Sequence, residues 1–312
     1  MILNTPIKRI KRRIDGVLLL NKPVGITSNT ALQIAKRLFQ AEKAGHTGTL
    51  DPFADGLLPL CFGEATKFAQ YQLEADKTYS ALLQLGVTTT TGDPEGEVLQ
   101  TTPVNLSAQA IHTVVAGFVG DIMQTPPMYS ALKYQGKPLY EYARAGITID
   151  RPARPVSIRA IHIDTIDLSA ATCTITVTCS AGTYIRTLAE DIGSRLGCGA
   201  HLTRLTRLAS GGFQLAQAVT LLQLEQDDIA TRDARLAAAD GLVNYLPSIS
   251  VDAPSAKLLM QGQHPLFQYE IEQFGLLRAY YQQQFLGLVQ LQTDGKLVPQ
   301  RLMSSRELLE TL

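Results

Sequence analysis

The chain has 312 residues, of which 45% are hydrophobic and 18% charged, so it can form a sizeable globular core and disorder is not expected. No apolar run reaches the roughly 18 to 20 residues that a membrane span needs. The N-terminus lacks the long apolar stretch of a secretory signal, so we expect a cytoplasmic protein. The 4 cysteines form no CxxC pair and the 5 histidines are scattered, so the sequence indicates neither disulfides nor a metal site.

The net charge is zero, but basic residues concentrate near the N-terminus. Residues 1–46 hold 9 Lys or Arg against 2 Asp or Glu, and a basic tail occupies about residues 1–14. Such a cluster can bind RNA phosphates, and it can equally be a solvated tail. Charge alone leaves both interpretations open.

Hydrophobic spacing predicts mixed strands and helices along most of the chain. In the first hundred residues we predict a strand at Gly16–Leu20, a helix from Thr27 or Ser28 to about Gln40, a loop over 42–56, a strand at Leu57–Phe62, a helix from about Glu64 to Leu73 and a strand at Lys77–Val87. Further on we predict a helix from Ser107 to about Phe118, strands at Ile158–Leu168 and Cys173–Ser180, a helix at Thr183–Leu196 and helical structure over 220–240.

These elements follow one another without a regular strand–helix repeat, which favours an α+β fold over a doubly wound sheet. Near residues 240–254 the pattern changes to short strands, such as Phe285–Leu291, with a turn at Thr293–Lys296. We therefore predict a large domain over residues 1–250 and a small, mainly-β domain over 251–312.

The loop at residues 45–56 concentrates unusual residues. It contains three glycines, which allow close backbone approach, and three ionisable groups: His46, Asp51 and Asp55. It lacks the pattern of a phosphate-binding loop, and no second histidine follows at metal-ligand spacing. Taken alone, Asp51 in such a loop is more often a turn former or cap than a nucleophile.

This loop and six further segments carry a family resemblance. Ala44–Pro52 and Gly56–Pro59 resemble the signature of TruB-type tRNA pseudouridine synthases. The other matching segments occur in the expected order: Gly16–Pro23, Gly63–Lys67, Asp76–Tyr79, Met128–Lys133, Gly182–Leu188 and Gly197–Leu202. The resemblance covers about residues 16–210 and weakens after about residue 245.

The resemblance implies a pseudouridine synthase fold, with a mixed, mainly antiparallel central sheet flanked by helices, and a small PUA-like C-terminal domain. It also implies that uridine-55 in the TΨC stem-loop of tRNA is isomerised: the uracil is detached from ribose, rotated and reattached through carbon. Neither a cofactor nor a metal is implied, and the family favours a monomer. Whether the nucleophile attacks ribose C1′ or uracil C6, or mainly stabilises a glycal-like intermediate, stays open.

By motif position, Asp51 matches the family's nucleophile, which must be ionised because a protonated carboxyl attacks poorly. Arg186 matches the arginine that pairs with this carboxylate and keeps it ionised. Tyr79 matches the residue that stacks on the target base and helps proton transfer. Without the resemblance, Arg186 is typical of a solvated helix residue and Tyr79 of a core aromatic.

The resemblance also implies four substrate-binding residues besides Tyr79. Tyr184 matches a base-contacting position and Leu205 a contact to the uracil, although Leu205 alone is typical of the core. His46 matches the histidine that fills the space left by the flipped base, and its alternative is a hydrogen-bonded loop histidine. Lys22 lies in a motif next to the pocket, where support of the site is expected.

Basic residues on the pocket's face are expected to contact RNA, because phosphate contacts position the nucleic acid. Lys133 and Lys137 are the strongest candidates, since they lie in or next to the Met128–Lys133 motif. The wider set is Lys8, Arg9, Lys11, Arg12, Arg13, Arg144, Arg151, Arg154, Arg204 and Arg207. Residues 214–312 carry 7 basic against 11 acidic residues, which lowers the share of RNA binding expected of the small domain.

Two other functions fit parts of the sequence. One is a non-catalytic protein that binds or folds tRNA on the same scaffold, although binding alone does not need Asp51, Tyr79 and Arg186 as a set. The other is a glycosidic-bond hydrolase with a paired acid and nucleophile. Asp51 and Asp55 are near in sequence, but nothing places an acid of raised pKa opposite the nucleophile.

Overall fold

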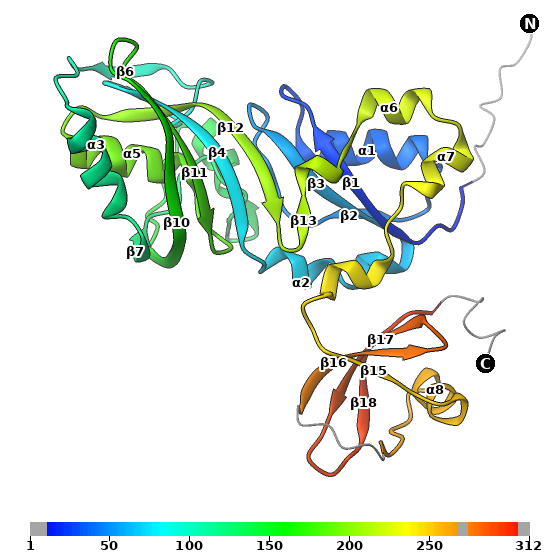
Figure 1. Cartoon of the computed structure of the whole chain (residues 1–312). Coiled ribbons are helices and arrows are strands. Elements are labelled where there is room, and N and C mark those ends of the chain that lie inside the picture. Colours follow the sequence, from blue (N-terminus) through cyan, green and yellow to red (C-terminus); the bar gives the residue numbers. More distant parts are fainter. Residues whose placement is uncertain (1–10, 268–273, 305–312) are drawn as a thin grey trace, which may run out of the picture.

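A computed structural model describes residues 11–267 and 274–304. It confirms the α+β class: Figure 1 shows a long, twisted sheet with helices packed against it and a small β module attached below one end. In the described ranges, no helix is both long and apolar enough to cross a membrane.

The central sheet has 10 strands and is mainly antiparallel. Its order is β14-β1-β3-β12-β4-β11-β10-β7, with β2 paired to β3 and β13 paired to β12; the pairs β1–β14 and β3–β12 are parallel. The strands are β1 (Gly16–Lys22), β2 (Ala44–His46), β3 (Asp55–Phe62), β4 (Lys77–Leu85), β7 (Gly120–Gln124), β10 (Arg154–Asp167), β11 (Thr172–Cys179), β12 (Ala200–Ser210), β13 (Phe213–Gln214) and β14 (Val219–Thr220). β1 and β3 are apolar on both faces because both faces are covered.

Two groups of helices pack at opposite ends of this sheet (Figure 1). One group contains α3 (Ala108–Ala116) and α5 (Ile185–Leu196), and the other contains α1 (Ser28–Leu38), α6 (Leu221–Gln226) and α7 (Ile229–Ala234). The predicted N-caps are confirmed: Thr27 accepts from the Thr30 amide at the start of α1, and Ser107 accepts from the Ala110 amide at the start of α3. These caps set where the two helices begin.

Shorter elements fill the connections. They are α2 (Ala69–Leu73), α4 (Leu139–Arg144), the hairpin strands β5 (Val87–Thr89) and β6 (Val98–Thr101), the hairpin strands β8 (Lys133–Tyr134) and β9 (Lys137–Pro138), and 3-10 turns at Gly63–Lys67, Leu215–Gln217 and Ala239–Val243. The turn of the β5–β6 hairpin and the segments on either side of the β8–β9 hairpin line the larger of two cavities described below.

The single helix predicted from Glu64 to Leu73 is wrong. A 3-10 turn ends at Lys67 and α2 begins at Ala69, with Phe68 between them. Phe68 is fully buried, and its ring centre lies 5.2 Å from that of Phe285 in the small module. This tertiary contact overrides the local helical spacing.

Further boundaries differ from prediction, among them the start of β10, which is Arg154 instead of Ile158. The strand expected to reach Val87 ends at Leu85, because Gly86 has a φ of +83° and turns the chain into a separate hairpin. The loop expected over 42–56 includes β2 and the first residues of β3, since sheet pairing extends into it. The helical stretch expected over 220–240 is two short helices and the start of a 3-10 turn.

The small module is a four-stranded sheet with one helix. Its order is β15-β16-β17-β18, and its elements are β15 (Ser248–Ser250), α8 (Ala253–Met260), β16 (Gly275–Tyr281), β17 (Gln284–Leu291) and β18 (Leu297–Leu302). One hydrophobic cluster contains Leu57 and Phe68 from the large part together with Leu286 and Leu288 from the module. The two parts therefore share a core, and the domain boundary at residue 250 stays a prediction.

Candidate active site

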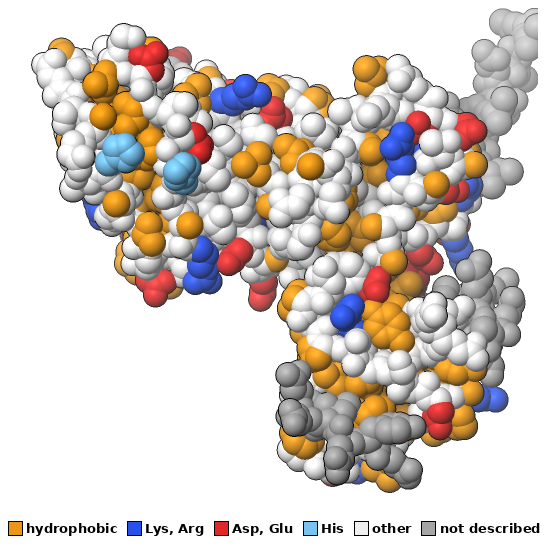
Figure 2. Space-filling view, viewed as in Figure 1, with side chains coloured by type: hydrophobic (Ala, Val, Ile, Leu, Met, Phe, Trp, Pro, Cys, Tyr) orange, Lys and Arg blue, Asp and Glu red, His pale blue; other side chains and the backbone are white. Residues whose placement is uncertain are grey.

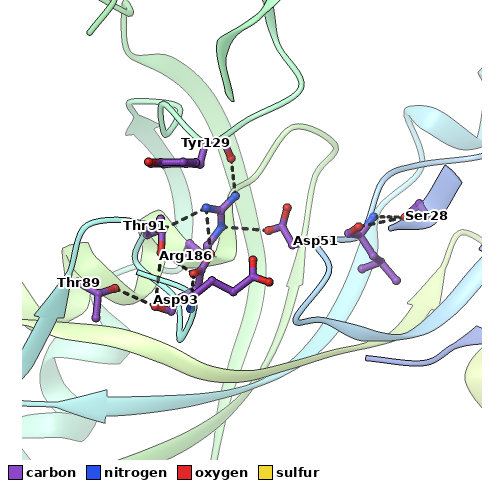
Figure 3. A network of polar contacts seen from close by, with 9 residues as sticks. Ser28, Asp51, Thr89, Thr91, Asp93, Tyr129 and Arg186 are labelled. Atoms are coloured by element: carbon purple, nitrogen blue, oxygen red, sulfur yellow. Dashed lines mark hydrogen bonds and ion pairs between the residues drawn. The ribbon is translucent and has the colours of Figure 1, made fainter. Parts of the chain in front are cut away.

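The loop that carries Asp51 is anchored to the start of α1. The Leu50 amide donates to Ser28 Oγ (2.8 Å), and Ser28 Oγ donates to the Leu50 carbonyl (3.1 Å) (Figure 3). The Gly25 amide donates to the Pro52 carbonyl at 2.8 Å. These bonds hold the backbone on either side of Asp51, whose side chain keeps 35% of its surface exposed.

Arg186, in the first turn of α5, binds two carboxylates with one guanidinium. Its Nε lies 3.0 Å from Asp51 Oδ2 and its Nη1 lies 3.2 Å from Asp93 Oδ2 (Figure 3). Nη1 also donates to the Thr91 carbonyl (3.0 Å), and Nη2 donates to the Tyr129 carbonyl (2.7 Å). The side chain is only 4% exposed, so the interpretation of Arg186 as a solvated helix residue is wrong.

The charge state of Asp51 is set by opposing influences. Burial raises the pKa of its carboxyl, the Arg186 guanidinium lowers it, and the nearby Asp93 carboxylate raises it. The net direction is upward. Because a carboxyl must be ionised to act as a nucleophile, Arg186 extends the pH range in which Asp51 can do so.

Asp51 and Arg186 lie on the border between two cavities. The smaller has a volume of about 260 Å³, below the roughly 300 to 1,000 Å³ typical of sites for drug-sized ligands. Its lining also includes Gly48, Lys77, Tyr79, Tyr184, Leu205 and Arg207. The larger has a volume of about 970 Å³ and includes His46, Asp93, Tyr129, Tyr140 and Arg144.

Three further predicted residues surround the smaller cavity. Tyr79 lies on β4 and Leu205 on the neighbouring strand β12, while Tyr184 is the residue immediately before α5. Gln124 fixes Tyr184, because its Oε1 accepts from the Tyr184 amide (2.7 Å) and its Nε2 donates to the Tyr184 carbonyl (3.0 Å). The structure thus gathers Asp51, Arg186, Tyr79, Tyr184 and Leu205 around one cavity, and their roles stay predictions.

His46, at the end of β2, lines the larger cavity with Asp51. Burial lowers the pKa of its imidazole, and the positive charge of Arg207 lowers it further. Its Nδ1 is buried and has no hydrogen-bond partner among the described residues. A neutral ring in this position suits a role of shape and stacking better than one of proton transfer.

Lys22, the last residue of β1, is fully buried and lines neither cavity. Its Nζ donates to the Pro23 and Ile26 carbonyls, both at 2.8 Å. Burial lowers the pKa of this amine to about 8. These contacts fix the turn before α1, so the structure favours support of the site and gives Lys22 no position for direct contact with substrate.

The two expected RNA-binding lysines lie outside the cavities. Lys133 and Lys137 are exposed on the β8–β9 hairpin, and Lys137 Nζ lies 3.7 Å from Glu141 Oε2. Arg144, from the helix that follows, does line the larger cavity. On the face shown in Figure 2, Lys and Arg side chains are scattered instead of forming one patch.

The basic tail lies only partly within the described residues. Lys8 and Arg9 fall outside them. Arg12 binds Asp233 with two guanidinium nitrogens, at 2.6 and 3.0 Å, and is therefore already paired within the chain.

One residue of the site, Asp93, escaped sequence analysis, and another, Arg207, was named only as a phosphate contact. Asp93 lies in the segment 91–96, whose composition predicts only a turn, and nothing in the sequence signals its ion pair with Arg186. Arg207 was expected to contact RNA phosphates from the pocket's face; it does line the smaller cavity, but it is only 1% exposed, and its role stays a prediction. A usable signal was its place two residues after the apolar Leu205, because residues i and i+2 lie on one face wherever the chain forms a strand, as it does here in β12.

The position of Asp55 concerns the alternative function of a glycosidic-bond hydrolase, which needs an acid opposite the nucleophile. Asp55, the acid nearest to Asp51 in sequence, lines neither cavity, and its Oδ2 lies 3.9 Å from Arg204 Nη2. It therefore does not face Asp51 across a bound substrate.

Solved structures of similar fold define the class of protein. The chain superposes with a TM-score of 0.70 and 23% identity on a chain of an H/ACA ribonucleoprotein bound to a substrate RNA containing 2′-deoxyuridine, covering 94% of this chain and 86% of that one. With an archaeal box H/ACA Nop10–Cbf5 complex, the TM-score is 0.69 and the identity 25%, over 94% of this chain and 87% of that one. The fold is that of the pseudouridine synthases.

Sequence comparison identifies the family. The model of the TruB family pseudouridylate synthase N-terminal domain matches residues 36–185, and two TruB C-terminal models match residues 186–244 and 247–303. The tRNA pseudouridine synthase B of Thiobacillus denitrificans is 57% identical, over 96% of this chain and 99% of that protein. That of Methylobacillus flagellatus is 54% identical, over 95% and 97%. The chain belongs to the TruB family of pseudouridylate synthases.

Proposed function

We propose that this chain isomerises uridine-55 in the TΨC stem-loop of tRNA to pseudouridine, with Asp51 as nucleophile and without a cofactor. Its relatives that share more than half of its residues are tRNA pseudouridine synthases, which supports the same activity here. The observation that carries the assignment of the site is the Asp51–Arg186 ion pair at the border of the two cavities.

The two cavities suit a substrate whose reacting base is separated from the rest of the RNA. An enzyme that acts on a base within a folded loop must first take that base out of its stack. The smaller cavity takes the flipped uracil between Tyr79, Tyr184 and Leu205, and the larger one takes neighbouring nucleotides. His46, on the larger side, fills the space that the base leaves.

Ionised Asp51, at the border between the two cavities, is the nucleophile that starts the reaction. The bond between ribose C1′ and uracil N1 breaks, the base turns within the small cavity, and a bond forms between C1′ and C5. The Arg186 guanidinium directs the carboxylate and favours its ionised form, because it lies 3.0 Å from Oδ2. Tyr79 stacks on the base and takes part in proton transfer.

The partner that follows from this proposal is the tRNA itself, bound by a monomer in the cytoplasm, where tRNA is available. Arg144 in the larger cavity and the exposed Lys133 and Lys137 contribute to phosphate contacts. Binding should weaken as the salt concentration rises, since each phosphate contact releases counterions.

Nucleotide-resolved detection of pseudouridine in unmodified tRNA, incubated with the protein, tests the proposal. We expect pseudouridine at position 55, and no product in a matched transcript with cytidine at that position. Conversion at another uridine would contradict the substrate assignment. Tight tRNA binding without conversion would instead establish the non-catalytic alternative.

A further inference from the structure

Arg207 is a buried cation in the smaller cavity without a carboxylate partner in the structure. It lies on β12, is 1% exposed and takes part in no ion pair within the described residues. Its Nε donates to the Leu57 carbonyl at 2.7 Å, whereas its Nη2 is buried with no hydrogen-bond partner in the same residues. An unpaired buried charge is destabilising, so its presence in a cavity wall indicates a functional contact.

The sheet register places Arg207 beside Tyr79. The two residues are directly opposite each other on the antiparallel strands β12 and β4. Residues opposite each other in this way share a face of the sheet, with Cβ atoms roughly 4.5 to 5.5 Å apart. Both line the smaller cavity, together with Leu205 from the same face.

Two glycines of the family signature make room for this arrangement. Gly56, on β3, has a φ of +104°, and a Cβ there would lie 2.4 Å from the Arg207 carbonyl oxygen. Gly48, in the Asp51 loop, has a φ of +139°, and a Cβ there would lie 3.4 Å from Arg207 Nη1. The loop and β3 thus close tightly around Arg207.

The two buried arginines of the cavity have different neighbours. Arg186 lies between Asp51 and Asp93 and its nitrogens are engaged by carboxylates and carbonyls. Arg207 has no carboxylate partner in the described residues; its Nε donates to the Leu57 carbonyl, and it lies directly opposite Tyr79. The guanidinium of Arg186 therefore serves the nucleophile, which leaves Arg207 to act on the tyrosine.

We propose that Arg207 positions the hydroxyl of Tyr79 to remove the C5 proton of the rotated uracil. This inference rests on the proposed isomerisation and adds a positioning residue to it. A guanidinium N–H donates to Tyr79 Oη, which holds the oxygen over the base and stabilises the negative charge that develops on it during proton transfer.

The proton transfer balances within the substrate. Once the C1′–C5 bond has formed, C5 carries both ribose and its original proton, and the ring holds an N1–C6 double bond. The C5–H bond breaks and its proton passes to Tyr79 Oη, while the phenol proton passes to N1, directly or through water. The C5–H electron pair restores the C5–C6 double bond, the N1–C6 π pair moves to N1, which binds the proton, and Tyr79 is a neutral phenol before and after the transfer.

A double-mutant cycle between Arg207→Gln and Tyr79→Phe tests this role. If Arg207 acts through the tyrosine hydroxyl, Arg207→Gln should lower kcat by up to about 10-fold in the otherwise unchanged enzyme, no more than removal of the hydroxyl itself does. In the Tyr79→Phe background it should lower kcat by less than about 3-fold, because the hydroxyl is already absent. Equal losses in both backgrounds, or none in either, would overturn the proposal.

An isotope effect gives a readout that a merely structural role would not move. With tRNA carrying deuterium at C5 of uridine-55, Arg207→Gln should show a larger isotope effect on kcat than the unchanged enzyme, because C5 deprotonation becomes slower. An equal isotope effect would overturn the proposal. If the unchanged enzyme forms no pseudouridine, the proposed function fails, and that result is distinct from any effect of Arg207.

Folding is controlled in two ways. Arg159→Gln removes an exposed arginine from β10 of the same sheet and should keep full activity. Should Arg207→Gln fail to fold, Arg207→Lys replaces it in the cycle, since it keeps the charge but lacks the guanidinium geometry. Arg207→Lys removes the guanidinium. If the folded variant kept the kcat of the unchanged enzyme, that result would count against the proposal.

Discussion

Polar side chains pair differently in two regions of the molecule: the two cavities, and the junction between the large part and the small β module. At the junction, Glu64 Oε2 accepts from Lys67 Nζ (2.6 Å) and Ser304 Oγ (2.7 Å), and Tyr280 Oη donates to Asp240 Oδ2 (2.6 Å). These partners satisfy one another. In the two cavities, by contrast, Arg207 Nη2 and His46 Nδ1 have no hydrogen-bond partner in the described residues, and Arg186 at their border binds two carboxylates.

This difference distinguishes polar groups that stabilise the fold from polar groups that are available to bind substrate. A polar contact that is complete within the chain stabilises the fold and has nothing left to offer a ligand. A buried group with unused hydrogen-bonding capacity is unfavourable in the free protein and gains a partner only when substrate binds. Mutations at the cavity should therefore affect catalysis, and mutations at the junction should affect stability.

The largest effect is expected from Asp51→Asn. An amide is not a nucleophile, so pseudouridine formation should fall by at least about 10³-fold while tRNA affinity stays within a few-fold. Single-turnover assays and filter binding measure the two quantities. Asp164→Asn, which alters an exposed aspartate on β10, serves as the control and should keep full activity. Full activity of Asp51→Asn would remove the nucleophile assignment.

Arg186→Gln should have the next largest effect, with a loss in kcat of about 10²-fold and a change in pH dependence. Asp51 must be ionised, so activity is present above its pKa and is lost as the pH falls through it. Removing the guanidinium removes the largest influence that lowers this pKa, while burial and Asp93, which raise it, remain. The acidic limb of the pH–kcat profile should therefore move to higher pH.

Arg186→Lys provides the matched control for that shift. It keeps a positive charge but not the paired geometry, so its acidic limb should lie between those of the unchanged enzyme and Arg186→Gln. Coincident acidic limbs in all three proteins would show that Arg186 does not govern the ionisation of Asp51.

Tyr79→Phe should lower kcat by about 10-fold and leave tRNA affinity unchanged. Phenylalanine keeps the ring that stacks on the base and removes only the hydroxyl. Comparison with Tyr79→Ala, which should weaken tRNA binding as well, separates stacking from proton transfer. A wild-type rate for Tyr79→Phe would mean that the hydroxyl is unused, and the inference about Arg207 would fall with it.

The smallest effect on activity is expected at the junction. Tyr280→Phe removes the hydrogen bond to Asp240 and should reduce the free energy of unfolding by about 1 kcal/mol. The rate of pseudouridine formation should stay within about 2-fold, because the change is remote from the cavities. Urea unfolding and the activity assay measure these effects. A large loss of activity in a stable protein would erase the distinction between the two regions.

Much of the local structure could be predicted because it depends on neighbouring residues. The N-caps at Thr27 and Ser107, the buried strand β1 and the amphipathic helix α5 follow from side-chain spacing and hydrogen-bonding chemistry. The helix expected from Glu64 to Leu73 failed at Phe68, where a contact with Phe285 from a distant part of the chain decides the conformation.

The sequence by itself determined the family and named Asp51, through ordered motifs that no single loop could supply. Only the tertiary structure decided what surrounds that carboxylate. Asp93 binds the same guanidinium from a segment that looks like an ordinary turn, and Arg207, expected only as a phosphate contact, is buried beside Tyr79. The physical reason is that periodicity reports local spacing, whereas burial and ion pairing arise when sheet pairing brings distant segments together.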